Sequence, residues 1–246
     1  MSRRGSRSGL IILVGILLLI SGCSRGDTRI LEDLGMIHTV SLDLPEQDRE
    51  GGTKGKVEAV ISYPSIGQRE TNGRELIRAE ADTAKEARIM MSEQSSRKLV
   101  DGQLRNVLFG TALAEQGLLK HIDSMVRDSN IGPHVLITLV EGSAGEMLVK
   151  DYPTSLLTHQ YIFQLLDTEI QRQVIPELNL YKFMRDYHDD GIEPAAPVLK
   201  DEGKCIRLKG IGLFVGDRYA GMIPINRSLT FAMLRRNIRQ GELILH

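Results

Sequence analysis

The sequence of 246 residues contains no tryptophan, and its aromatic content is only 4%. Surfaces that stack sugars or nucleic-acid bases are built from aromatic rings, so the composition argues against such a surface. An excess of one charge is also missing, since 31 basic and 32 acidic residues give a formal net charge of −1. A nucleic-acid-binding domain would be strongly basic. We therefore expect no nucleic-acid partner.

The only long apolar run, 10–20, follows three arginines in MSRRGSR and precedes Gly22-Cys23. A basic start, a short apolar centre and small residues before a cleavage site predict a secretory signal. A cysteine at that site is the pattern of a bacterial lipoprotein, with cleavage between Gly22 and Cys23 and lipid attached to Cys23. An uncleaved signal anchor is the alternative, but a membrane span needs roughly 20 apolar residues.

Cysteine is scarce as well, because Cys23 and Cys205 are the only two. If Cys23 carries lipid, Cys205 has no partner for an intramolecular disulfide, and the stability of the fold must come from its cores. Cys205 stands at the start of a predicted strand in KCIRL. We expect it to be a small buried apolar residue rather than a nucleophile.

Hydrophobic periodicity divides the rest of the chain into a lipid-anchored tether, 23–34, and two domains, 35–154 and 155–246. In the first domain, the three- and four-residue spacing of Ile77, Ala81 and Ala84 predicts a helix packed on a sheet. The predicted order is β-β-α-β-α-β-α, with strands at 35–44, 56–63, 106–110 and 133–140 and helices at 74–99, 111–127 and 143–149.

The second domain is predicted to have the order α-α-β-β-β-α. Pro176 suits the first turn of its second helix. The predicted helices are 155–172, 176–191 and 229–239, and the predicted strands are 196–200, 205–215 and 219–225. The expected fold class is therefore α+β, with two small domains that each pack helices on a mixed or antiparallel sheet after a lipoprotein signal peptide.

Recognisable catalytic, cofactor and metal motifs are missing. None of the six histidines has a zinc-like spacing to another histidine or to a cysteine, and there is no G-x-S-x-G motif. His188-Asp189-Asp190 is expected to be a solvated helix end. The glycine-rich stretch 46–55 predicts a hairpin loop, because it lacks the spacing of a phosphate-binding loop. Gly210 and Gly212 lie inside a predicted strand, where they indicate a bulge or a close backbone contact. We expect a protein that is not an enzyme, without cofactor or metal.

Several segments, taken in order, resemble the Ger(x)C family, the lipoprotein C subunits of spore germinant receptors. They are the cleavage motif at Cys23, the helix at 80–97, Arg127-Asp128, and the segments 29–36 (RILEDLGM), 107–117 (VLFGTALAEQG) and 210–217 (GIGLFVGD). Family members often have Trp-Asp after the lipidated cysteine, where this chain has Ser24-Arg25. The family also has a third, C-terminal α/β domain, and this chain stops about where that domain would begin. We therefore expect only the first two family domains here.

The resemblance implies a lipid-anchored protein on the outer face of the cytoplasmic or spore inner membrane. It also implies assembly with two integral-membrane partners, the A and B receptor subunits. Cys23 is the only residue whose role transfers. Two other functions stay open: an extracytoplasmic lipid-anchored solute-binding protein and, as the weakest alternative, a cell-envelope hydrolase.

Overall fold

The computed structural model describes residues 33–46, 55–65 and 73–235. The predicted signal peptide, Cys23, most of the 46–55 loop and the end of the last predicted helix lie outside these ranges. From Leu34 onward, the described residues belong to one compact unit. Within the described ranges, no helix is long and apolar enough to cross a membrane.

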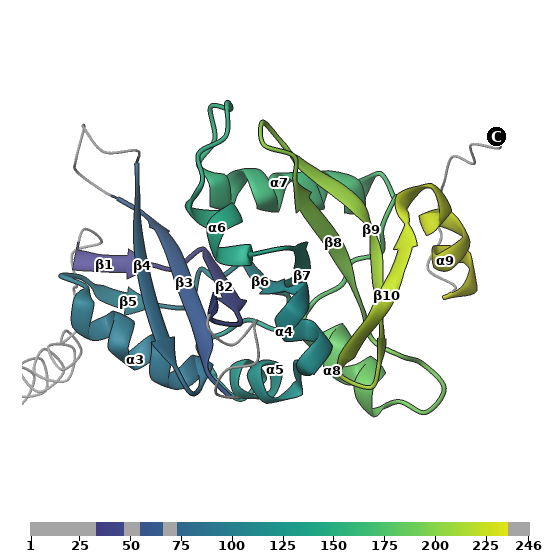
Figure 1. Cartoon of the computed structure of the whole chain (residues 1–246), viewed down its shortest axis with the longest axis horizontal. Helices are drawn as coiled ribbons and strands as arrows, with labels where there is room; N and C mark the ends of the chain where they lie inside the picture. The colour runs from purple at the N-terminus through teal and green to yellow at the C-terminus, as the bar shows by residue number, and fades with distance from the viewer. Residues whose placement is uncertain (1–32, 47–54, 66–72, 236–246) are drawn as a thin grey trace, which may run out of the picture. The chain divides into compact units, whose positions relative to one another are not determined.

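The first half of the described chain contains seven strands and four helices (Figure 1). In chain order they are β1 (Leu34–Met36), β2 (Thr39–Asp43), β3 (Val57–Pro64), β4 (Arg74–Ala81), α3 (Ala84–Gln94), β5 (Lys98–Val100), β6 (Asn106–Gly110), α4 (Thr111–Gln116), α5 (Leu119–Val126), β7 (Leu136–Glu141) and α6 (Ala144–Val149). The second half contains α7 (Thr158–Gln171), α8 (Leu180–His188), β8 (Ala195–Asp201), β9 (Ile206–Val215), β10 (Arg218–Pro224), the 3-10 turn η2 (Ile225–Arg227) and α9 (Ser228–Leu234).

Eight of these strands form one mixed sheet in the order β10-β9-β8-β7-β6-β2-β3-β4. The four central strands, β2, β6, β7 and β8, run parallel, and an antiparallel pair flanks them on each side. The expected α+β class, a mixed sheet packed with helices, is confirmed. The sheet also joins the two halves, because β7 pairs with β8 through Leu139 and Val198. The boundary predicted at 154/155 thus falls between α6 and α7, inside one compact unit.

Each face of the large sheet has its own apolar core. Helices α3, α5 and α8 cover one face and contribute Met91, Ile122 and Phe183 to its core. Helices α6, α7 and α9 cover the other face, where Met147 and Ile162 are fully buried. Figure 1 shows α6 and α7 above the central strands β2, β6 and β7, and α3, α5 and α8 below them. Burial on both faces explains the nearly continuous apolar run of β6, every residue of which is buried.

The predicted helix at 74–99 is wrong at both ends, because α3 stops at Gln94 and the last two predicted residues belong to strand β5. Residues 74–81 form β4, which pairs antiparallel with β3 over its whole length, and the helix α3 begins only at Ala84. The segment RELIRAEA also alternates, and the alternation places Ala79 and Ala81 on the buried side. The segment therefore fits both the helical and the strand period, and pairing with β3 selects the strand. Thr83 then caps α3 by accepting a hydrogen bond from the Glu86 N–H.

Two other predicted helices differ from the structure: one is divided in two, and the other begins later than predicted. The helix predicted at 111–127 is divided into α4 and α5 at Gly117, whose φ of 116° is open only to glycine. A side chain there would also meet the Asp217 carboxylate, 2.6 Å from the added carbon. Asp217, in the turn between β9 and β10, accepts a hydrogen bond from the Leu119 N–H at the start of α5. The second helix of the second half begins at Leu180 rather than at Pro176, because Asn179 caps it.

The glycines of β9 behave as predicted, whereas Cys205 does not. A methyl group at Gly210 would lie 2.0 Å from the Ile223 carbonyl oxygen, and the register with β8 shifts beside it. Gly212 likewise leaves room for Leu139, because a Cβ atom added at position 212 would lie 2.7 Å from Leu139 Cδ1. Cys205 was expected to be buried, but it is exposed in the bend before β9. The buried positions of that strand begin one residue later, with Ile206.

A candidate ligand-binding cleft

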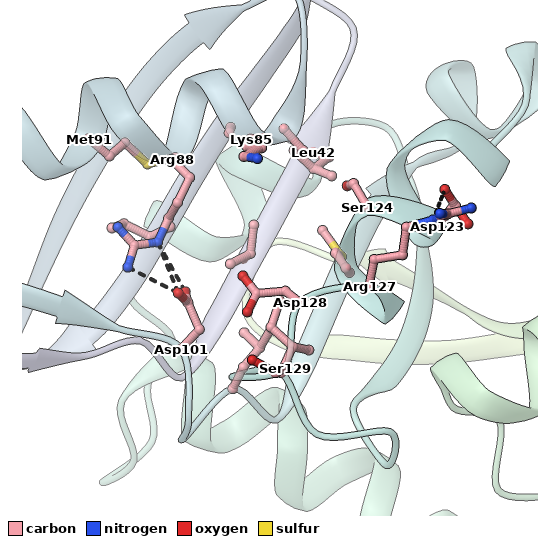
Figure 2. Close-up of a pocket in the computed structure, with 17 residues that line it drawn as sticks. Leu42, Lys85, Arg88, Met91, Asp101, Asp123, Ser124, Arg127, Asp128 and Ser129 are labelled. Carbon is pink, nitrogen blue, oxygen red and sulfur yellow. Dashed lines mark hydrogen bonds and ion pairs between the residues drawn. The ribbon is translucent and has the colours of Figure 1, made fainter.

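A cleft of about 540 Å³ opens between α3 and α5 on one face of the large sheet. We call it the α3–α5 cleft. Its size falls within the range of small-molecule sites in proteins. Figure 2 shows its walls, with α3 on one side and the end of α5 with the following turn on the other. The lining residues are Val40, Leu42, Ala59, Ile61, Ala84, Lys85, Arg88, Met91, Asp101, Leu104, Asp123, Ser124, Met125, Arg127, Asp128, Ser129 and Ile131.

The floor of the cleft is apolar. Val40 and Leu42 of β2 face it beside Ala59 and Ile61 of β3, because alternate residues of a strand share one face. Met91 of α3 closes the floor on one side, and its side chain is fully buried. Of these floor residues, Val40 is partly exposed and offers an apolar surface to the cleft.

Two ion pairs line the walls, and within each pair the two charges neutralise each other. Arg88 donates from Nε and Nη2 to the Asp101 carboxylate, at 3.1 and 3.0 Å, and from Nη2 to the Leu99 carbonyl at 2.9 Å. Arg127 pairs with Asp123 at 2.8 Å, one helical turn away. These four charged groups are already engaged with one another (Figure 2).

One cation and one carboxylate of the lining stand outside these two pairs. Lys85 is exposed in the first turn of α3, and no described residue pairs with its ammonium group. Asp128 lies half-buried after α5, where its Oδ1 accepts from the N–H and side-chain amide of Asn130, each at 2.9 Å. In Figure 2 the Asp128 carboxylate points into the cleft.

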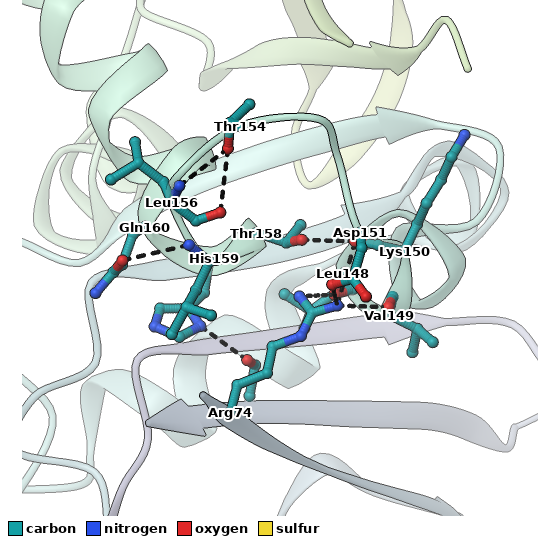
Figure 3. Close-up of polar contacts among 12 residues, drawn as sticks. Arg74, Leu148, Val149, Lys150, Asp151, Thr154, Leu156, Thr158, His159 and Gln160 are labelled. Atoms are coloured by element: carbon teal, nitrogen blue, oxygen red, sulfur yellow. Dashed lines mark hydrogen bonds and ion pairs between the residues drawn. The ribbon is translucent and has the colours of Figure 1, made fainter. Parts of the chain in front are cut away.

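On the opposite face of the sheet, buried polar groups hold α6 in place. At its N-terminus, the Asp43 carboxylate accepts hydrogen bonds from the Ala144 and Gly145 N–H groups, at 2.9 and 2.7 Å. At its C-terminus, the Arg74 guanidinium donates to the Leu148 and Val149 carbonyls and pairs with Asp151 (Figure 3). Asp43 and Arg74 are both buried. They are positioning residues for the helix rather than parts of a cleft.

Beside Arg74, α7 contributes a buried histidine. His159 Nδ1 lies 2.9 Å from the Ser62 hydroxyl, and its ring lies 5.0 Å from that of His38. Burial, with smaller contributions from His38 and Arg74, lowers the pKa of His159 to about 4. Burial likewise lowers the pKa of His38. His159 is therefore neutral at pH 7, as a buried histidine without a carboxylate partner should be.

The residues singled out in the sequence do not gather in one place. His188, Asp189 and Asp190 are exposed at the end of α8, and within the described ranges no three acidic, histidine or cysteine side chains are placed to share a metal ion. Cys23 and the predicted cleavage site lie outside the described residues. The lining charges of the cleft were missed, although Arg127-Asp128 was one of the segments that carried the family resemblance. Only the packing of α3 against α5 brings the lining charges together.

Comparison with known proteins places the chain in a family. Residues 27–201 match the family model described as "Spore germination protein N-terminal domain". The chain belongs to this family of spore germination proteins. The resemblance to the Ger(x)C family is thereby confirmed at the level of the family.

The relatives of this spore germination family member are distant and longer. Spore germination protein GerQC of Bacillus cereus is 24% identical over 232 residues, which cover 94% of this chain and 62% of the relative. YfkR of Bacillus subtilis (strain 168), named provisionally as a spore germination protein, is 25% identical over 68% of this chain and 44% of its own length. The chain thus spans less than two thirds of each. The crystal structure of the GerBC protein aligns with a TM-score of 0.42 at 13% identity, over 82% of this chain and 57% of that chain.

Proposed function

We propose that the protein is a non-enzymatic, lipid-anchored subunit of a nutrient germinant receptor. It would act in spore germination on the outer face of the cytoplasmic or spore inner membrane, held there by lipid on Cys23. The match of residues 27–201 to the spore germination family carries the germination role. The lipid anchor rests on the N-terminal signal pattern that ends at Gly22-Cys23.

The anchor has a simple physical rationale. Each buried methylene of an acyl chain contributes about 0.8 kcal/mol to membrane binding, and one chain alone binds only marginally. A diacylglycerol on Cys23 would insert two chains, which is enough for stable attachment. A subunit held in this way can act through its surfaces, without an active site of its own. We propose that its partners are the integral-membrane A and B subunits of the receptor.

Replacement of Cys23 tests the anchor. Cys23→Ala should move the protein out of the membrane fraction or leave it as an unprocessed precursor, and it should abolish labelling by an alkyne-tagged fatty acid. Cys205→Ala is the matched control, because Cys205 is the other cysteine and is exposed. The control should be labelled and retained in membranes like the wild type.

Germination gives the second measurement. In a strain that lacks the chromosomal copy, Cys23→Ala should slow nutrient-triggered loss of optical density, while Cys205→Ala should restore it fully. Affinity capture of the wild type from spore membranes should recover the A and B subunits. Full germination with a soluble Cys23→Ala protein would refute the anchoring role, and normal germination without the gene would refute the germination role.

The α3–α5 cleft favours a second candidate, an extracytoplasmic lipid-anchored solute-binding protein. A cavity of about 540 Å³ with an apolar floor and a polar lining is the usual form of a small-molecule site. A saturable rise in melting temperature with one solute in a library would support this candidate. A library that produces no shift would leave the surface-mediated role as the better account.

A further inference from the structure

From the geometry of the α3–α5 cleft we infer a binding site for a small zwitterion whose apolar body separates a carboxylate from an ammonium group. The inference goes beyond the receptor role and gives the second candidate function a ligand class. It rests on three properties of the cleft: its apolar floor, its balanced charge and the opposite electrostatic sign of its two walls.

The charge balance disfavours a ligand with a large net charge. Three cations and three carboxylates line the cleft, and their charges sum to zero. Arg88 with Asp101 and Arg127 with Asp123 form internal pairs, which a ligand could engage only by breaking them. The groups left for a ligand are the Lys85 ammonium and the Asp128 carboxylate.

Lys85 and Asp128 stand on opposite walls, and the helices strengthen the polarity. Lys85 lies in the first turn of α3, where backbone N–H groups create positive potential. Asp128 follows the last turn of α5, where carbonyl groups create negative potential, and its N–H donates to the Met125 carbonyl at 3.2 Å. Glu86, the acidic residue in the first turn of α3, already accepts from the Asp82 N–H at 3.1 Å. A carboxylate is therefore favoured at the α3 wall and an ammonium group at the α5 wall.

The floor between the two walls selects an apolar body. Val40, Ala84 and Ile131 are partly exposed to the opening, and the buried side chains of Leu42, Ile61 and Met91 back them from below. A ligand body of methylene groups would be removed from water on this surface, at about 25 cal/mol for each Å² of apolar area. A polar body would lose its hydration there without gaining hydrogen bonds.

The test uses 6-aminohexanoate as the zwitterion, with hexanoate and hexylamine as probes that each lack one charge. Binding to the full-length protein in detergent micelles is followed by ligand-observed NMR titration. The inference predicts saturable binding of 6-aminohexanoate that is tighter than that of either single-charge probe. Absence of binding, or equal affinity for all three probes, would overturn it.

Two conservative variants test the orientation. Lys85→Gln should weaken 6-aminohexanoate and hexanoate by about two- to fivefold, as expected for an exposed ion pair, and should leave hexylamine unchanged. Asp128→Asn keeps an oxygen for the Asn130 hydrogen bonds, and it should weaken 6-aminohexanoate and hexylamine but not hexanoate. If both variants bind all three probes like the wild type, the charges do not hold the ligand and the inference fails.

A variant that fills the cleft tests the location. Ala84→Trp places an indole at the lining of the cleft and should lower the affinity for 6-aminohexanoate at least tenfold. Glu93→Trp, on an exposed part of the same helix, is the matched control and should bind like the wild type. Unchanged binding by Ala84→Trp would refute the location. Cys23→Ala does not touch the cleft, so a failure of this site and a failure of the receptor role can be told apart.

Discussion

Asp43 offers the sharpest test of what holds the fold together. Its buried carboxylate accepts hydrogen bonds from the first two N–H groups of α6, at 2.9 and 2.7 Å, and another from the Ser143 hydroxyl at 3.3 Å. Asp43→Ala would leave the Ala144 and Gly145 N–H groups buried without an acceptor. A hydrogen bond to a charged group contributes about 1.5–3 kcal/mol, so losing both backbone bonds should lower the free energy of unfolding by about 3–6 kcal/mol.

Chemical denaturation followed by circular dichroism measures this loss. For a chain of this length a decrease of 1 kcal/mol lowers the melting temperature by about 2–4 °C, so we expect a fall of about 10 °C. Asp123→Ala is the control, because Asp123 forms a largely exposed ion pair with Arg127 and should cost less than about 1 kcal/mol. A loss below about 1 kcal/mol for Asp43→Ala would refute the assigned role of the carboxylate.

Two further predictions concern close packing and pH. Gly110→Ala would place a methyl group 2.2 Å from Asp43 Oδ1, so it should lower the melting temperature markedly. Gly102→Ala is the control and should change the melting temperature little, because no atom lies within 4 Å of the added methyl group. Equal decreases in melting temperature for the two variants would contradict this prediction. Burial lowers the pKa of both His121 and His159 from 6.5 to about 4, so the unfolded chain binds more protons than the folded chain between these values. Stability should therefore fall by more than about 1 kcal/mol per pH unit from pH 6 to pH 5 in urea titrations, and His159→Asn should flatten this slope. A slope that His159→Asn leaves unchanged would show that His159 does not contribute to it.

Local patterns predicted most elements because burial on one or two faces leaves a period in the sequence. The run NVLFG predicted β6, and the helical spacing around Leu166 predicted α7. Residues 74–81 were missed because RELIRAEA fits both periods, and only pairing with β3 selects the strand. Cys205 was misplaced because burial starts at Ile206, and a single apolar residue at a strand end does not reveal on which side of the bend it lies.

The candidate cleft shows more clearly what the sequence alone cannot predict. Lys85 and Asp128 are 43 positions apart in the sequence, and nothing near either residue indicates that both line one cavity. Arg127-Asp128 was part of the family resemblance, but its use as a wall of the cleft depends on where α3 lies. Similarly, Asp43 and Gly145 are distant in sequence and meet only because β2 and α6 pack together.

By itself the sequence determined the α+β class, the family and most helices and strands, and it predicts an N-terminal lipoprotein signal that ends at Cys23. These follow from composition, short motifs and periodicity, which are properties of neighbouring residues. Only the tertiary structure decided that one eight-stranded sheet joins both halves, that Asp43 and Arg74 hold the two ends of α6, and that a polarised cleft opens between α3 and α5. Strand order and helix packing depend on contacts between residues far apart in the chain, and such contacts leave no periodic trace in the sequence.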